Sequence, residues 1–250
     1  MYLWKCWRDV RGFFFVGIAY LVILLVLAIR HHSVDANNIS LLWVLWGFTI
    51  VHAALLCVLA WGMGSLGVGG EIGKGVGAYL LTRPRQRKLF LWQEWLISMA
   101  LLSTLLILAV CIFLAEIRLH YFGFGYQTTA MPASDVFHLK YIMLAGICGL
   151  LLVALVYSMT YFFTMITRSS SRGLIFAIGT ITAYLFMKME INEYAPHLSS
   201  HIPDLVLVPF IGHASATTLH EGLFVSILLR LTVILLFPLA AQFVLERAEV

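Results

Sequence analysis

The sequence predicts an all-α integral membrane protein with six transmembrane helices. Of the 250 residues, 62% are hydrophobic and only 11% are charged, whereas about 25% of the residues of a soluble domain carry a charge. A helix needs about 20 apolar residues to cross the hydrocarbon core of a bilayer, and the chain offers six apolar runs near that length. Only short connections remain between them, so residues 1–250 are expected to form a single transmembrane domain.

The segment before the first apolar run, residues 1–12, predicts a short N-terminal interfacial helix. It places two tryptophans three positions apart and three cations on other faces, namely Trp4, Trp7, Lys5, Arg8 and Arg11. Indole rings favour the membrane interface and cations favour anionic lipids, so this helix would lie along the bilayer surface. The alternative is a basic tail that only sets the topology.

The apolar runs give the positions of the expected spans. The runs cover residues 13–29, 39–66, 95–115, 140–167, 173–187 and 222–245. No small-residue cleavage site follows the first run, so we expect it to be retained as a span and not removed as a signal peptide.

The distribution of lysine and arginine predicts that the N-terminus and the C-terminus are both cytoplasmic. Short loops rich in these residues stay on the cytoplasmic side of a membrane. With an internal N-terminus, the inner side carries eleven cations: Lys5, Arg8, Arg11, Lys74, Arg83, Arg85, Arg87, Lys88, Arg168, Arg172 and Arg247. The outer side carries four: Arg30, Arg118, Lys140 and Lys188. We therefore expect a multi-pass protein of the inner or plasma membrane.

The connection between the second and third spans, residues 69–93, is the longest polar stretch on the predicted inner side. Eight glycines lie from Gly62 to Gly77, and each interior glycine weakens a helix by about 1 kcal/mol relative to alanine. We therefore expect the second helix to break at Gly69 and Gly70.

A short amphipathic helix is expected after the glycines, at residues 71–81. Four of its apolar side chains share one side at helical spacing, namely Ile72, Val76, Tyr79 and Leu80. The helix would end before Pro84, because proline has no backbone donor and restricts the residue that precedes it. The sequence GxxxxGK[ST] does not occur in this loop, and no strand could precede it, so nucleotide binding is not expected.

The phrase EIGKGVGAYLLTRPRQR, residues 71–87, resembles the loop between spans two and three in the membrane subunits of type-2 ATP-binding-cassette exporters. In those six-span subunits, this loop carries an acidic residue, a glycine-containing short helix and an LLxxPxxR stretch. The matching residues here are Glu71, Gly75, Leu80, Leu81, Pro84 and Arg87. The resemblance extends over the whole predicted topology, but its specific motif covers only this phrase.

The resemblance implies that the chain is the permease subunit of an ATP-driven exporter. In that family the loop is a coupling helix, which docks on a separate ATPase subunit and transmits its closure to the membrane domain. Glu71 would make the acidic contact, while Arg83 and Arg87 would anchor the loop to the ATPase or to the lipid surface. A second permease chain, identical or different, would complete the pathway. The chain itself would be non-catalytic, with no cofactor and no nucleic acid bound.

The longest outer connection, residues 188–221, includes an apolar stretch at 203–211 that is too short to span a bilayer. Pro203 and Pro209 interrupt this stretch, which predicts a re-entrant or interfacial segment. The resembled exporters also have short helices that enter the outer leaflet between the fifth and sixth spans. Such backbone must be covered by protein or water.

Histidines gather near the predicted outer face and raise an alternative function. Histidine is the commonest metal ligand, and His197 and His201 have the i, i+4 spacing that suits one face of a helix. Together with His52 in the second span, they would fit a membrane-embedded metal or redox subunit, and a scaffold subunit of a larger membrane complex is a further possibility. However, polar aromatic residues collect at membrane interfaces in any case. The outer histidines are His31, His32, His120, His138, His197, His201, His213 and His220.

Arg230 lies about 12 Å into the last predicted span, as judged from the rise of an α-helix. A charge inside the membrane costs at least ~2.5 kcal/mol, so Arg230 is expected to face protein or a water-filled cleft. Pairing with Glu221, Glu116 or a backbone carbonyl is one interpretation of this intramembrane polar site. Contact with an anionic headgroup or substrate is the other.

Overall fold

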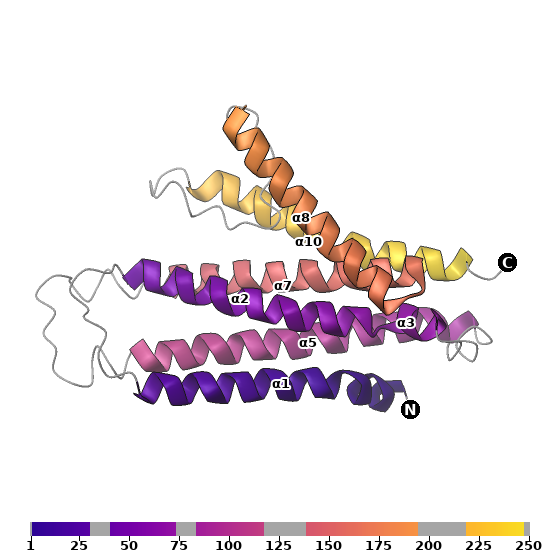
Figure 1. Cartoon of the computed structure of the whole chain (residues 1–250), viewed down its shortest axis with the longest axis horizontal. Coiled ribbons are helices and arrows are strands. Elements are labelled where there is room, and N and C mark those ends of the chain that lie inside the picture. Colours follow the sequence, from indigo (N-terminus) through magenta and orange to yellow (C-terminus); the bar gives the residue numbers. More distant parts are fainter. Residues whose placement is uncertain (1, 31–40, 74–83, 118–138, 195–218, 248–250) are drawn as a thin grey trace, which may run out of the picture.

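The computed structural model describes residues 2–30, 41–73, 84–117, 139–194 and 219–247 (Figure 1). These residues form seven helices and no strand. The helices are α1 (Tyr2–Arg30), α2 (Leu41–Ser65), α3 (Val68–Gly73), α5 (Pro84–Ile117), α7 (Leu139–Thr167), α8 (Ser170–Tyr194) and α10 (Leu219–Arg247).

Six of the described helices are long and apolar enough to cross a membrane. The predicted all-α fold with six candidate membrane spans is therefore confirmed for the described residues. Both chain ends, together with α3, lie at the same end of the helix bundle (Figure 1). The candidate spans are Trp4–Val26, His52–Ile72, Lys88–Ile112, Gly146–Thr167, Ser170–Tyr194 and Ile227–Arg247.

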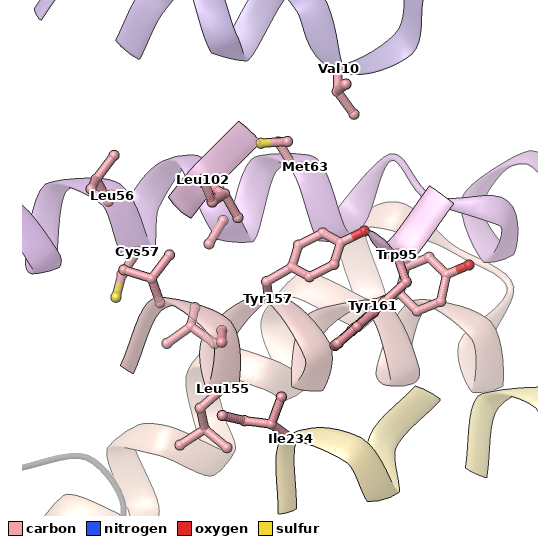
Figure 2. Close-up of a cluster of buried hydrophobic side chains, with 14 of the residues drawn as sticks. Val10, Leu56, Cys57, Met63, Trp95, Leu102, Leu155, Tyr157, Tyr161 and Ile234 are labelled. Atoms are coloured by element: carbon pink, nitrogen blue, oxygen red, sulfur yellow. The ribbon is translucent and has the colours of Figure 1, made fainter. Parts of the chain in front are cut away.

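Helix α7 lies at the centre of the bundle, where it packs against α2, α3, α5, α8 and α10. Its side chains are buried along most of its length, and Val153, Tyr157 and Tyr161 are fully covered. Figure 1 shows α1, α5, α2 and α7 side by side, while α8 tilts away from them. The rings of Tyr157 and Tyr161 point to the same side of α7 (Figure 2). The core of the fold is therefore built around this one helix.

The N-terminal residues do not form a separate surface helix, contrary to the sequence prediction for residues 1–12. Helix α1 is continuous from Tyr2 to Arg30. The side chains of Cys6 and Val10 belong to the buried hydrophobic core, at 2% and 3% exposure. Because these apolar side chains pack inside the bundle, the first turns of α1 extend the first span.

The break in the glycine-rich region also differs from the prediction. Helix α2 gives way to α3 at Leu66 and Gly67, whereas Gly69 and Gly70 are helical. Close packing explains the difference, because a β-carbon on Gly69 would lie only 2.5 Å from the backbone nitrogen of Met165 on α7. Glycine at this position allows two helices to meet and does not end either of them.

Thr164 of α7 lies between glycines of two different helices. Gly69 of α3 faces the backbone carbonyl group of Thr164, and a β-carbon on Gly173 of α8 would lie 2.6 Å from the Thr164 Cα. The Thr164 hydroxyl is satisfied within α7, where it donates a hydrogen bond to the carbonyl of Thr160 at 2.8 Å. Helices α3 and α8 therefore approach α7 so closely that neither Gly69 nor Gly173 leaves room for a side chain of its own.

Several helices extend beyond the predicted spans. Helix α5 begins at Pro84, so residues 84–93 of the predicted loop are helical, and proline suits this first position because its missing N–H would have no partner there. Helix α8 continues to Tyr194 and α10 begins at Leu219, which shortens the predicted outer loop 188–221 at both ends. Helical backbone satisfies its own hydrogen bonds, so a helix does not have to end where the hydrocarbon core ends.

Two predictions lie outside the described residues. The amphipathic helix expected at residues 71–81 begins inside α3 but falls mostly within 74–83, and the re-entrant segment at 203–211 falls within 195–218. Both stay predictions.

Candidate functional site

The junction of α3 with α1, α5 and α7 is the strongest candidate for a functional site. It lies at the end of the bundle that holds both chain ends (Figure 1). Helix α3 also contains the first residues of the predicted coupling segment, which is residues 71–87. Helix α3 has only six residues, and a helix this short is unstable on its own. Neighbouring helices must therefore hold it in place.

An ion pair joins α3 to α1. The Lys5 ammonium contacts the Glu71 carboxylate, and the two side chains are 27% and 22% exposed. The same ammonium nitrogen lies 5.3 Å from the centre of the Phe90 ring on α5. An ion pair that water reaches typically contributes about 0–1 kcal/mol. This contact therefore orients Glu71 more than it stabilises the fold.

A buried carboxylate fixes the start of α3. Glu94 on α5 is 8% exposed, and its Oε2 accepts hydrogen bonds from the Val68 backbone N–H and from the Tyr161 hydroxyl, each at 3.1 Å. Val68 is the first residue of α3, and the first N–H groups of a helix have no partner within it. An intramolecular hydrogen bond typically contributes about 0.5–1.5 kcal/mol. Three helices thus meet at one oxygen of a buried side chain, whereas water reaches the ion pair between α1 and α3.

Further polar side chains lie beside this carboxylate on α5 and α7. The ring of Tyr157 stacks on that of Tyr161 with their centroids 5.9 Å apart, and Trp95 Nε1 donates a hydrogen bond to Ser158 Oγ at 3.0 Å. The hydroxyls of Tyr157 and Ser98 are both buried and lie close enough to interact with each other. Several buried polar side chains therefore lie together at the interface between α5 and α7.

A second set of polar contacts ties the start of α5 to the end of α10. Lys88 Nζ pairs with Glu246 Oε1 at 2.8 Å, and Trp92 Nε1 donates to Gln242 Oε1 at 3.0 Å. Gln242 Nε2 in turn donates to Glu246 Oε1 at 2.8 Å. The helix that follows the predicted coupling segment is therefore attached to the last helix of the chain.

Comparison with known protein families matches residues 42–250 to a family described as a protein of unknown function (DUF2705). The chain belongs to the DUF2705 family. Neither the curated proteins nor the solved structures give a match to this chain. The DUF2705 match includes Glu71, Glu94 and Tyr161 and begins after α1, so Lys5 lies outside it.

The predicted coupling residues are only partly described in this DUF2705 chain. Glu71 lies in α3 and is paired with Lys5, while Pro84 and Arg87 lie in the first turn of α5. The other three predicted coupling residues lie outside the described residues, namely Gly75, Leu81 and Arg83.

Sequence reasoning missed Glu94 and Tyr161. The predicted third span begins just after Glu94, which puts this acid at a membrane boundary, where charges are common. One signal was present, because Glu94 is the only acidic residue in the candidate span Lys88–Ile112. Its partners Val68 and Tyr161 lie 26 and 67 positions away, so the sequence alone could not identify them.

Arg230 is buried in α10, at 1% exposure. It lies close enough to Cys148 of α7 and to Tyr184 and Lys188 of α8 for electrostatic interaction. Its positive charge is therefore placed inside the bundle, near the contact of α10 with α7. Two predicted partners have side chains outside those that the structure describes, namely Glu116 and Glu221.

His52, the histidine predicted inside a span, is buried in α2. Its Nδ1 lies 2.6 Å from the Tyr20 hydroxyl of α1, so a hydrogen bond links the two helices. Among the residues that are described, no three or more His, Cys, Asp or Glu side chains form a group that could hold a metal ion. The side chains of the outer histidines are not among those described.

Removing the ion pair between α1 and α3 is expected to have a small effect on stability. The coupling energy from Lys5→Ala, Glu71→Ala and the double variant should be below about 1 kcal/mol and should fall as salt rises. Reversible unfolding of the purified chain in detergent measures it, with Arg8→Ala as the control for loss of a nearby cation. A coupling energy above about 2 kcal/mol would instead indicate a pair shielded from water.

Proposed function

We propose that the chain is the membrane-spanning permease subunit of an ATP-driven ATP-binding-cassette transporter, an exporter, and that a separate ATPase subunit drives it. The junction at α3 carries this proposal. Side chains attach α3 to α1, α5 and α7, and α3 leads into the segment that resembles a coupling helix. Movement of that segment would therefore pass to three membrane spans.

The distribution of charge supports a cytoplasmic position for this end of the bundle. The first turns of α1, the turn between α7 and α8, and the last turn of α10 all lie there (Figure 1). Short segments rich in lysine and arginine stay in the cytoplasm, so both termini would be cytoplasmic in an inner or plasma membrane. The cations at this end include Lys5, Arg8, Arg11, Arg168, Arg172 and Arg247.

In this proposal the chain performs no covalent chemistry. ATP binding closes the ATPase subunits, the segment from Glu71 to Arg87 moves with them, and α3 transmits the movement to the bundle. Two permease chains, identical or different, form the pathway between them. ATP hydrolysis takes place on the partner.

Replacing Glu71 or Arg87 by alanine is expected to weaken binding of the ATPase subunit by about tenfold or more, because loss of one charged interface contact readily costs the 1.4 kcal/mol that this factor represents. The tagged full-length chain is purified from its native membranes with its companions. A companion with a GxxxxGK[ST] sequence is the expected ATPase. Its affinity for the wild-type chain and for each variant in lipid nanodiscs is then measured.

Two control variants sharpen this experiment. Glu193→Ala changes an exposed acid near the end of α8 that lies far from α3 and should leave ATPase affinity unchanged. Lys5→Ala removes the partner of Glu71. If Glu71 contacts the ATPase directly, this variant should bind the ATPase at least as tightly as the wild-type chain does. The proposal fails if no ATPase accompanies the wild-type chain or if both loop variants bind normally. Copurified metal or haem would then favour the metal or redox alternative.

A further inference from the structure

The sequence of α3 does not explain why this helix holds its position. It reads VGGEIG, and six residues with interior glycines have little helix stability of their own. The amides of Gly70 and Glu71 donate to the nearby carbonyl of Gly67, at 2.8 and 3.4 Å. Contacts with other helices must therefore determine where α3 lies.

Glu94 is the contact that joins the most helices to α3. Among the side chains that the structure describes, it is the only acidic one that is buried. A buried carboxylate is unfavourable unless hydrogen-bond donors face it, and its two donors, the Val68 N–H and the Tyr161 hydroxyl, belong to α3 and α7. Displacing α3 removes one of these donors, so the position of α3 and the satisfaction of the carboxylate depend on each other.

The other contacts of α3 cannot replace this one. The Lys5–Glu71 ion pair is partly exposed, so water and salt weaken it. The contact of Gly69 with α7 is close but has no directional bond, and it would allow α3 to slide. Among the contacts of α3 that the structure describes, the hydrogen bond to Glu94 is the one that is both buried and directional.

We propose that Glu94 is a positioning residue that fixes α3 to α5 and α7. Because the coupling segment begins at Glu71 within α3, Glu94 also fixes the start of that segment. This inference rests on the proposed function for its consequence in transport. Glu94 acts through the backbone of Val68, and Tyr161 orients the Glu94 carboxylate toward that amide.

Hydrogen exchange of the full chain in lipid nanodiscs tests the anchoring of α3. Tyr161→Phe and Glu94→Ala each remove part of the anchor, so the amides of residues 66–73 are expected to exchange about tenfold faster or more. Glu94→Gln keeps a carbonyl acceptor of the same shape and should retain most of the protection. Exchange in the outer half of α5 should stay as in the wild type, which separates local release of α3 from general unfolding.

Tyr157→Phe is the matched control. It removes an equally buried hydroxyl from the same helix, but one that makes no hydrogen bond to Glu94, and it should leave exchange at residues 66–73 unchanged. Equal acceleration in Tyr157→Phe and Tyr161→Phe, or no acceleration in Tyr161→Phe, overturns the proposal. Tyr161→Phe keeps the aromatic ring, so this variant tests the anchoring of α3 even if Glu94→Ala does not fold.

The consequence for coupling is measured on the complex with the ATPase subunit. Tyr161→Phe should lower ATP turnover of the complex severalfold while leaving ATPase affinity unchanged, whereas Glu71→Ala is expected to weaken that affinity. Faster exchange with normal turnover overturns the positioning role. Failure of the proposed function is seen separately, as the absence of a bound ATPase on the wild-type chain.

Discussion

Replacing Gly69 by alanine is expected to destabilise the folded chain by about 3 kcal/mol, the upper part of the range for overpacked sites. The new β-carbon would lie 2.5 Å from the Met165 nitrogen and closer still to the carbonyl group of Thr164. These are backbone atoms of a central helix, so no rotamer change can make room. Helix α3 would have to move away from α7, and the hydrogen bond from Val68 to Glu94 would lengthen with it.

Gly179→Ala is the matched control for this effect. Gly179 lies in α8, and a β-carbon there would meet nothing within 4 Å, so alanine should be neutral or stabilising by up to about 1 kcal/mol. Denaturant unfolding in detergent, followed by circular dichroism, compares the two variants. Equal stability of the two would contradict the close contact between α3 and α7.

Replacing Leu105 by alanine is expected to destabilise the chain by about 2 kcal/mol, the lower end for buried leucines. Leu105 on α5 is fully buried, and its methyl groups fill the space in front of Gly17 on α1. In a bilayer the transfer of apolar surface contributes little, because lipid tails are as apolar as leucine, and the loss comes from packing. Removing the side chain leaves a cavity between α1 and α5 that glycine cannot fill.

Ile107→Ala separates packing from hydrophobicity. Ile107 lies on the same helix but is 60% exposed, so lipid can replace the lost atoms and the expected change is below about 0.5 kcal/mol. The same unfolding experiment measures both variants. If Ile107→Ala costs as much as Leu105→Ala, the packing of α1 on α5 is not what holds this part of the bundle.

The six spans could be predicted because the thickness of the hydrocarbon core sets a minimum length for an apolar helix. The helix ends were less predictable. Polar residues follow the apolar run in α8, but the helix continues through them to Tyr194, because backbone hydrogen bonding and not composition decides where a helix ends. Similarly, Pro84 was interpreted only as the end of one helix, although it is also the first residue of the next.

The candidate site was predicted only in part. Glu71 was identified from its motif, but its partner Lys5 lies 66 positions away, and sequence spacing carries no information about such a contact. The glycines at 69 and 70 predicted a weak helix, because the sequence cannot reveal that Thr164 will lie against one of them. Glu94 required the fold to bring Val68 and Tyr161 to it. Local patterns identified the segment, while long-range packing determined how it is held.

The position of Thr164 between α3 and α8 has a mechanical consequence. Both helices contact this one residue of α7, and the contact lies near the start of α8, whose far end diverges from the bundle (Figure 1). Tilting α8 about that point moves its two ends in opposite directions. Because the contact at Gly173 lies near the start of α8, a small tilt there would displace the far end of this helix more than its start.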